Sequence, residues 1–488
     1  MGELKDHAIS GVKWQTISTI YSTIVRVLQV AVLARFLDKS DFGLMGIAVL
    51  VNSFCSIYSD MGLSAAAMHK INLSKEEFSS FYWFNIFVGF VLTVAVSLCS
   101  PIIANFYHEP ELTKVISLTS LMIVGGSISS LQRTIQQKKM NFGFLSIVDI
   151  ISATLLFISN YFFASSGFGV FSLVYSSLIG TAFVALAYVV LALFKEKNIL
   201  LHFKFSEIKE ALKIGIFQVG SSTLDFFSRE FDSMIISSSF PMGLFGVYTL
   251  CKNVTQKLYG LINPIITNVM TPIFAQLQTD KSKISGGYIK MVNLLGFVNF
   301  PLYSIIGIAS YSFMSILYGS SYGQYSYILF FMAYFYAFQS LGNPVSSLLV
   351  AMGKTDRGFY WTIFRIIFTV IYLYIGSRFS FVIFLIFILC TPFITCWPSW
   401  KIMMSKVIDL SFKQDLLLML KPFVMCFPLM PLYFIDRWIN FPLVSFPLMV
   451  IVILAGYGAM NYFFRREIFD YFVNTLRSEL NKYKNHVR

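Results

Sequence analysis

Charge is scarce in this chain. Of its 488 residues only 12% are charged and 56% are hydrophobic, whereas soluble domains have about a quarter of charged residues. This composition excludes an ordinary soluble domain. Apolar runs of about 20 residues, the length that crosses the hydrocarbon core of a bilayer, recur along the whole chain between short polar segments. We therefore predict an all-α integral membrane protein.

Clusters of catalytic or metal-binding side chains are also lacking. The six cysteines are scattered through apolar segments, which favours neither a disulfide framework nor a zinc site. The five histidines lie too far apart for a triad or a metal site. Gly353-Lys354-Thr355 resembles the end of a phosphate-binding loop, but Leu348 stands where its first glycine belongs. We expect no catalytic residue, metal or cofactor, and a secondary transporter rather than an enzyme.

Acidic residues are outnumbered by basic ones, 24 against 37. The basic residues lie in the gaps between apolar runs and form no patch, so nucleic acid is not an expected partner. The apolar runs predict fourteen spans, at 10–36, 42–68, 78–104, 113–132, 142–164, 169–194, 212–238, 243–275, 288–313, 325–352, 358–377, 379–400, 416–435 and 440–464. Because nearly all loop cations, such as Arg133, Lys138 and Lys281, then share one side, we expect both termini in the cytoplasm.

An internal repeat is visible when the chain is aligned with itself. A shift of 203 residues pairs Gln15 with Gln218 and Arg26 with Arg229. The repeat predicts two parallel six-helix bundles at 1–200 and 201–404, extra helices 13 and 14 at 405–464, and a basic cytoplasmic tail at 465–488. In transporters built from such repeats, the substrate path lies at the junction of the halves.

Polar side chains recur at helical spacing on three of the predicted spans. They are Gln15, Ser18, Ser22, Arg26 and Gln29 on the first span, Gln218, Ser222, Asp225, Arg229 and Asp232 on the seventh, and Tyr248, Lys252, Thr255, Tyr259 and Asn263, with Lys257 beside them, on the eighth. An arginine in hydrocarbon costs at least about 2.5 kcal/mol, which favours a wet cavity. We predict that Arg26, Arg229, Lys252 and Lys257, with Gln15 and Gln218, bind an anion there.

A second interpretation assigns these ions to helix pairing. Arg26 and Arg229 would then pair with acids such as Asp60, Asp225 or Asp232. Asp60 and Asp149 are equally compatible with a coupling-cation or proton site and with hydrogen bonds between helices. Arg365 either contributes to the cavity or extends to the membrane interface.

Three further features each have two interpretations. Pro264, Pro272 and the pair Asn343-Pro344 would kink helices, for gating or for packing. The basic tail and the segment 203–213 either lie on an anionic membrane surface or act as topological anchors.

The segment Gly11 to Lys70 closely resembles the Wzx-type polysaccharide flippases, in particular the branch of WzxC and the teichuronic-acid exporters. The resemblance rests on Gly-Val-Lys-Trp at 11–14, Leu-Ala-Arg-Phe-Leu at 33–37, Asp-Phe-Gly-Leu at 41–44 and Asp-Met-Gly-Leu at 60–63. It implies the fold of the MOP superfamily, shared with MurJ and MATE transporters: two six-helix bundles in a V, plus two C-terminal helices.

The resemblance also implies a function. The expected substrate is a polyprenyl-pyrophosphate-linked oligosaccharide, flipped from the inner to the outer leaflet of the bacterial inner membrane for surface-polysaccharide biosynthesis, such as that of lipopolysaccharide. Membrane lipid, a polysaccharide polymerase and other assembly proteins are the implied partners. The family's cationic cavity residues carry over to Arg26 and, through the repeat, to Arg229.

Two rival functions fit the sequence less well. A MATE-type exporter of small molecules would need acidic residues for cationic substrates, whereas the predicted cavity is basic. A membrane polysaccharide polymerase or acyltransferase would need a large external loop or a catalytic His or Asp, and the sequence offers neither.

Overall fold

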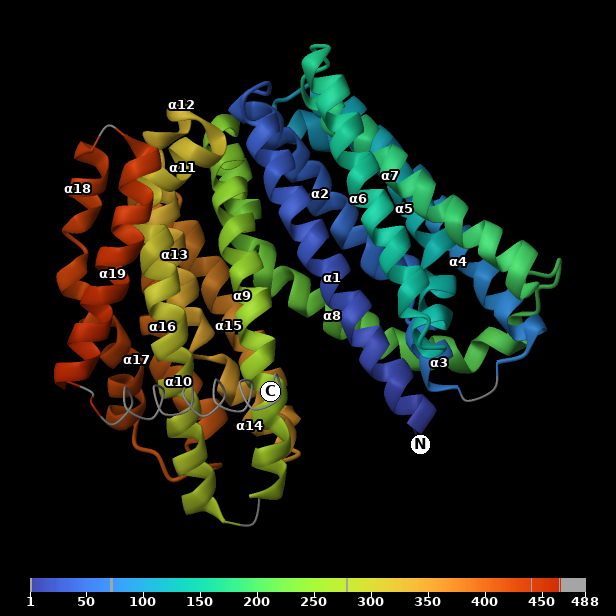
Figure 1. Cartoon of the computed structure of the whole chain (residues 1–488). Helices are drawn as coiled ribbons and strands as arrows, with labels where there is room; N and C mark the ends of the chain where they lie inside the picture. Colours follow the sequence, from blue (N-terminus) through green and yellow to red (C-terminus); the bar gives the residue numbers. More distant parts are fainter. Residues whose placement is uncertain (1, 71–72, 278–279, 440, 465, 467–488) are drawn as a thin grey trace, which may run out of the picture. The chain divides into compact units, whose positions relative to one another are not determined.

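The computed structural model describes residues 2–70, 73–277, 280–439, 441–464 and 466. Every regular element in these residues is a helix, as Figure 1 shows. The predicted all-α class is therefore confirmed. By the density of its internal contacts, the chain divides into two compact units, residues 1–249 (unit 1) and 250–488 (unit 2).

Unit 1 contains the following elements: α1 (Gly2–Leu33), α2 (Lys39–Ser59), α3 (Leu63–His69), α4 (Lys75–Tyr107), α5 (Glu111–Lys138), α6 (Phe142–Ser165), α7 (Val170–Val190), the π-helical turn η1 (Leu191–Glu196), α8 (Phe205–Ser239) and the beginning of α9 (Met242–Gln276). The long helices begin at recognisable caps. Before α4, the Ser74 hydroxyl accepts the Glu77 amide at 3.1 Å and the Glu77 carboxylate accepts the Ser74 amide at 3.2 Å. This reciprocal pair satisfies backbone donors that a helix start leaves open.

Unit 2 contains the rest of α9 and these elements: α10 (Lys281–Ile308), α11 (Ser310–Tyr318), α12 (Ser320–Gly323), α13 (Ser326–Ser340), α14 (Asn343–Ala351), α15 (Thr355–Gly376), α16 (Phe381–Ser399), η2 (Trp400–Met404), α17 (Phe412–Cys426), η3 (Phe427–Leu429), α18 (Leu432–Trp438) and α19 (Pro442–Phe464). The predicted basic tail falls almost entirely outside the described residues.

Each predicted apolar run falls on one or two of these helices. Among the described residues, 11 helical segments are long and apolar enough to cross a membrane. The predicted runs at α8, α9 and α13–α14 are not among the 11. Polar side chains lower the hydropathy of α8 and α9, and α13 and α14 have only 15 and 9 residues. The exact count of fourteen spans stays a prediction.

The boundary between the units differs from the predicted boundary between the repeats near residue 200. It lies at Thr249, because α8 packs against α2, α3 and α4 and so joins unit 1. The units are defined by contacts between helices, whereas the predicted repeats are defined by similarity within the sequence, so the two boundaries need not coincide. The observed units therefore do not test the repeat boundaries, which stay a prediction.

A helix break separates α2 from α3. Met61 and Gly62 have positive φ angles of 43° and 75°, and the Asp60 carboxylate accepts the Ser64 amide at 3.1 Å. A side chain at Gly215 of α8 would place its Cβ 1.8 Å from the Met61 carbonyl oxygen. Glycine at 215 is thus what lets the α8 backbone contact the break.

The segment that joins α7 to α8 is attached to the start of α4. The Ser80 hydroxyl donates to the Glu207 carboxylate at 2.6 Å and accepts the Lys204 amide at 3.0 Å. The Trp83 indole donates to the Leu200 carbonyl at 2.8 Å. The hydrogen bond from Ser80 lowers the pKa of Glu207, so this carboxylate stays ionised at neutral pH.

The apolar side chains of the segment 203–213 are only partly covered by protein, because Phe203 and Phe205 are 54% and 57% exposed. Ile208 and Ala211 are buried in one cluster with Phe78, Phe81 and Leu131 of α4 and α5. Burial in this cluster accounts for Ile208 and Ala211, and the membrane-surface and anchor interpretations of the segment stay predictions.

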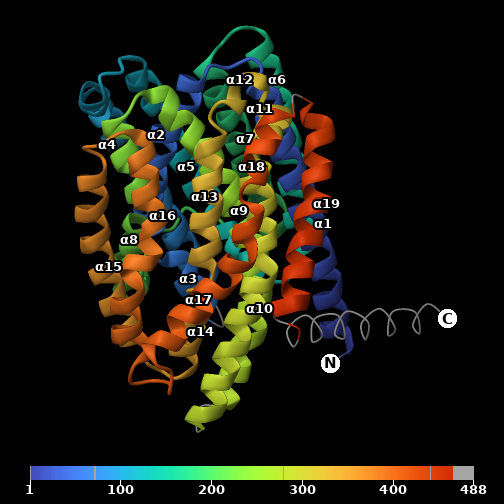
Figure 2. The ribbon, with the colours of Figure 1, turned by 90° about the vertical axis from the view of Figure 1, so that its left-hand side faces the viewer.

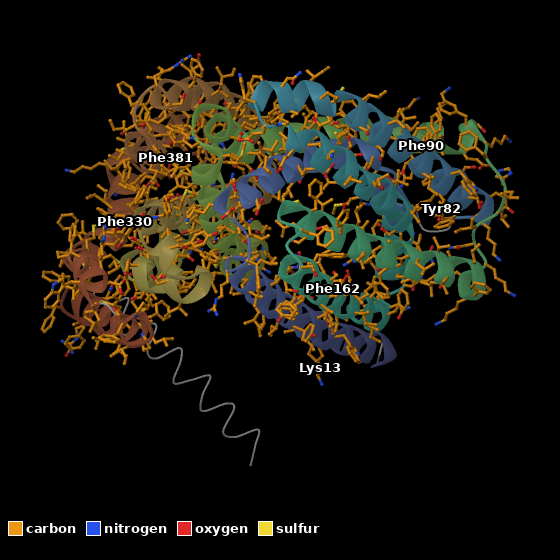
Figure 3. The ribbon with its side chains drawn as sticks, turned by 90° about the horizontal axis from the view of Figure 1, so that it is seen from above. Lys13, Tyr82, Phe90, Phe162, Phe330 and Phe381 are labelled. Carbon is orange, nitrogen blue, oxygen red and sulfur yellow. The ribbon has the colours of Figure 1, made fainter. Side chains whose placement is uncertain are left out.

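The outward side chains of unit 1 are largely apolar. Phe90 of α4 and Phe162 of α6, both labelled in Figure 3, are 58% and 62% exposed. Tyr82 of α4, also labelled, is only 4% exposed. Large exposed aromatic side chains at this frequency suit a surface that faces lipid rather than water.

Helix α10 forms the centre of unit 2. It packs against α13, α17 and α19 (Figure 2), and its Phe300 and Tyr303 are fully buried. Gly296 of α10 lets Pro422 of α17 approach closely, and its carbonyl accepts the Tyr457 hydroxyl of α19 at 3.3 Å. The helices beyond residue 405 are therefore part of the core of unit 2.

A fully buried carboxylate, Asp436, fixes α18 in unit 2. It accepts the Ser312 amide at 3.1 Å, the Ser312 hydroxyl at 2.5 Å and the Ser445 hydroxyl at 2.6 Å. The three donors come from the first turns of α11 and α19. A negative charge at these helix starts also opposes their positive dipole ends.

Candidate functional site

The predicted polar stripe of α1 lies in two environments. Ser18 and Gln29 are buried, and α1 packs against α6. Gln15 and Arg26 are exposed. An exposed guanidinium on a helix apolar enough to span a membrane needs water, a headgroup or an anion beside it, because hydrocarbon solvates it poorly.

The predicted stripe of α8 is also divided. Gln218, Asp225 and Arg229 are exposed. The Arg229 Nε donates to the Asp225 carbonyl of its own helix at 3.3 Å. Asp232 is half-buried and accepts a hydrogen bond from the Tyr248 hydroxyl of α9. The end of the stripe thus binds protein, whereas its middle is exposed.

A face of α8 next to this stripe packs against α2. The Tyr58 and Thr223 hydroxyls lie 3.1 Å apart, and the rings of Phe54 and Phe226 are 5.5 Å apart. Phe226 is buried. These contacts fix the rotation of α8, and Arg229, three residues after Phe226, lies on the adjoining, exposed part of the helix surface.

Asp60 connects α2, α3 and α4. Besides the amide of Ser64, its carboxylate accepts the Ser64 hydroxyl and the Asn85 amide group, the latter at 3.3 Å. Asn85 is fully buried and also donates to Ser130 of α5 at 3.4 Å. In this structure Asp60 therefore makes hydrogen bonds between helices, one of its two predicted roles.

Asp149 of α6 forms a bidentate ion pair with Arg133 of α5. The guanidinium nitrogens lie 2.8 and 2.9 Å from the two carboxylate oxygens. The side chains are 37% and 25% exposed, so water or headgroups screen the pair in part. The sequence offered Arg133 only as a loop cation that sets orientation. Nothing in the spacing of residues 133 and 149 indicates a contact across two helices.

Breaking this pair should destabilise unit 1. We expect Arg133→Ala to lower the free energy of unfolding by about 2 kcal/mol. Because the pair is partly exposed, this loss lies between that expected for breaking a surface ion pair and that expected for breaking a buried one. The reversal Arg133→Asp with Asp149→Arg should recover about half of the loss. The melting temperature of detergent-solubilised protein measures both. Lys283→Ala is the control, since its exposed pair with Asp280 at 3.2 Å should contribute little. An unchanged melting temperature for Arg133→Ala would contradict the assignment.

Two of the predicted cations lie on α9 in unit 2. Lys252 is 5% exposed and Lys257 is half-buried. Both residues interact with other parts of the protein. Burial of an ammonium among protein groups differs from the exposure of Arg26 and Arg229. The four predicted cations therefore occupy at least two kinds of environment.

The polar stripe of α9 continues into a network within unit 2. The Tyr259 hydroxyl donates to Asn343 at the start of α14 at 2.5 Å, and Asn299 of α10 donates to Asn263 at 3.2 Å. The Nε atom of Arg365 in α15 is buried. Which of its two predicted roles Arg365 has stays a prediction.

The prolines that were predicted to kink helices lie in two different positions, inside a helix and at the start of one. Pro264 and Pro272 lie inside the continuous helix α9. Pro344 stands in the first turn of α14, where its missing amide costs nothing, and the chain turns at Leu341 and Gly342 just before it. The break therefore places the Asn343 side chain at a helix start, beside Tyr259.

Two compact units of apolar helices, with cations and amides on their polar faces, define a multi-pass membrane protein of the helical transporter class. The chain belongs to the polysaccharide biosynthesis protein family, whose sequence profile matches residues 32–327. The resemblance stated from the motifs is thereby confirmed.

Individual proteins with similar sequences are also polysaccharide biosynthesis proteins. The chain is 25% identical to the lipopolysaccharide biosynthesis protein WzxC of Escherichia coli K12, over 87% of this chain and 86% of that protein. It is 28% identical to the teichuronic acid biosynthesis protein TuaB of Bacillus subtilis, over 74% of each chain. The solved lipid II flippase MurJ, in an inward closed conformation, superposes with a TM-score of 0.72 at 15% identity, covering 93% of this chain and 99% of MurJ. The MurJ-like fold is confirmed.

Proposed function

We propose that the protein is a flippase that moves a polyprenyl-pyrophosphate-linked oligosaccharide from the inner to the outer leaflet for surface-polysaccharide assembly. Three likenesses support this function: the polysaccharide biosynthesis family, the lipopolysaccharide and teichuronic acid biosynthesis proteins WzxC and TuaB, and the fold of the lipid II flippase MurJ. The observation that carries it is the exposed Arg26 on a helix apolar enough to span the membrane. Such a charge is costly unless an anion or water meets it.

In this proposal Arg26, Arg229, Lys252 and Lys257 bind the pyrophosphate, whose oxygens suit guanidinium and ammonium donors. Gln15 and Gln218, both exposed, would add neutral donors. Alternating access would open the cation-bearing site first to one side of the membrane and then to the other. The polyprenyl tail would stay in lipid, because apolar chains gain nothing from leaving it.

The proposal includes location, organisation and partners. We place the protein in the bacterial inner membrane with both termini in the cytoplasm, since the loop cations favour that side. The two six-helix repeats would be 1–200 and 201–404, followed by extra helices 13 and 14. A polysaccharide polymerase and other assembly proteins would take over the flipped substrate.

A translocation assay tests the proposal directly. Purified protein is reconstituted into liposomes that carry fluorescent polyprenyl-pyrophosphate oligosaccharide from the host strain, and the fraction accessible to an external quencher is followed. We expect exchange between leaflets well above that of protein-free liposomes. Transport of a cationic dye by the same vesicles, without movement of the lipid, would instead support a MATE-type exporter and refute the proposal.

A further inference from the structure

Unit 1 contains a partly open cavity, lined by polar and apolar side chains, that the predicted cationic site does not use. Its volume is about 420 Å³, and α2, α5, α6 and α7 line it. The lining residues lie near the middle of each of these helices, for example Asn52 in α2, Ser152 in α6 and Thr181 in α7. The cavity is therefore about as far from either membrane surface as these helices allow.

The lining is rich in neutral hydrogen-bonding groups: Asn52, Ser53, Ser56, Ser129, Ser152, Ser177 and Thr181. None of the described residues that line the cavity is charged or aromatic. Small-molecule sites of about 300–1,000 Å³ are usually mostly apolar. Hydroxyls beside apolar side chains such as Val49 and Leu156 suit an occupant that presents both hydrogen-bonding groups and apolar surface.

The hydrogen bonds of these groups leave both donors and acceptors available. Ser56 donates to the Asn52 carbonyl at 2.7 Å and Ser129 to the Gly125 carbonyl at 3.1 Å, so both hydroxyl oxygens can still accept. The Asn52 Oδ1 atom is buried and has no hydrogen-bond partner among the described residues. An unsatisfied buried polar group costs roughly 1–3 kcal/mol, so a ligand that bonds to several of these groups would be stabilised.

Glycine 126 of α5 marks an open wall of the cavity. A Cβ at this position would meet no other atom within 4 Å. A glycine inside a helix costs about 0.5–1 kcal/mol relative to alanine, although there is room for a side chain. Because Gly126 has no side chain, the part of the cavity next to it stays open.

We propose that this cavity binds one neutral sugar unit of the lipid-linked oligosaccharide. The inference rests on the proposed function and names a subsite apart from the cations. A monovalent cation is a poorer fit, because a desolvated ion needs charged or multiple convergent ligands, and the lining described here is neutral. A sugar carries several hydroxyls that both donate and accept, which matches the mixed groups of the lining, and the volume suits one ring rather than a chain.

Binding measurements on the detergent-solubilised full chain test the subsite. Two probes are compared: the host's polyprenyl-pyrophosphate oligosaccharide and bare polyprenyl pyrophosphate. The wild type should bind the sugar-bearing lipid more tightly. Gly126→Leu should fill the cavity and weaken that binding about tenfold while leaving bare polyprenyl pyrophosphate unaffected. Gly458→Leu in α19 is the matched control, since a Cβ there also meets nothing within 4 Å.

A second variant guards against a folding defect. Ser177→Ala adds no bulk and removes one hydroxyl, and it should weaken binding of the sugar-bearing lipid about threefold, the typical effect of one hydrogen bond. Unchanged binding of bare polyprenyl pyrophosphate shows that each variant is folded. Wild-type affinity for the sugar-bearing lipid in both variants would refute the sugar subsite but not the proposed function. The cavity would then hold only water. Failure of the wild type to bind either lipid would overturn the proposed function and the subsite with it.

Discussion

Replacing Arg26 or Arg229 with alanine is expected to reduce export of surface polysaccharide at least tenfold. Each guanidinium is exposed, Arg26 on a helix apolar enough to span a membrane and Arg229 on the more polar helix α8. A pyrophosphate there would form charge-assisted hydrogen bonds of roughly 1.5–3 kcal/mol, equivalent to about 10- to 100-fold in affinity. Lysine at either position should restore export in part, because it keeps the charge but loses the bidentate geometry. Surface polysaccharide in a deletion strain that expresses each variant measures the effect.

The matched control for these variants is Arg378→Ala. Arg378 is also exposed, but it lies just after α15 and stacks on Tyr374, with the guanidinium carbon 4.6 Å from the ring centre. We expect it to export normally. Membrane abundance must be equal in all variants, so that loss of export reports the site and not the fold. Normal export by both Arg26→Ala and Arg229→Ala would exclude the guanidinium groups from substrate binding.

Replacing Asp436 with alanine is expected to destabilise unit 2 by about 3 kcal/mol. The fully buried carboxylate accepts three hydrogen bonds from Ser312 and Ser445, and bonds to a charged group contribute about 1.5–3 kcal/mol each before its desolvation is subtracted. Asp436→Asn should cost less than Asp436→Ala, because the amide oxygen still accepts and a serine hydroxyl can rotate. The melting temperature in detergent and the amount of membrane-inserted protein measure the loss.

Asp409→Ala provides the control for Asp436. Asp409 is exposed, and its hydrogen bond to Ser285 uses only its backbone amide, which alanine keeps. Its melting temperature should match that of the wild type. If Asp436→Ala melted at the wild-type temperature as well, the three hydrogen bonds would not be a significant stabilising contact between α11, α18 and α19.

The candidate site was partly predictable. Gln15, Ser18, Arg26 and Gln29 are found by helical spacing, and the two arginines are matched by the repeat. The structure nevertheless buries Ser18 and Gln29 while it exposes Gln15 and Arg26. A helical stripe defines an angular sector of one helix, but the neighbouring helix decides which part of the sector is covered.

Contacts between distant residues were beyond the sequence. The ion pair of Arg133 with Asp149, the hydrogen bond of Tyr259 with Asn343 and the carboxylate of Asp436 each join residues whose separations follow no helical period. In a chain with so many serines and other polar side chains, any of many residues could have been the partner. The hydroxyl-lined cavity of unit 1 was missed for the same reason.

The sequence alone determined that this is a helical membrane protein, where most of its helices lie, and which family it belongs to. Hydropathy and motif identity are local properties, and a bilayer admits few solutions other than helices for such apolar runs. Only the tertiary structure decided that α8 joins unit 1, which acids are paired, and where polar groups enclose a cavity. Those outcomes depend on how helices pack against one another, and packing is set by the shapes of many side chains at once.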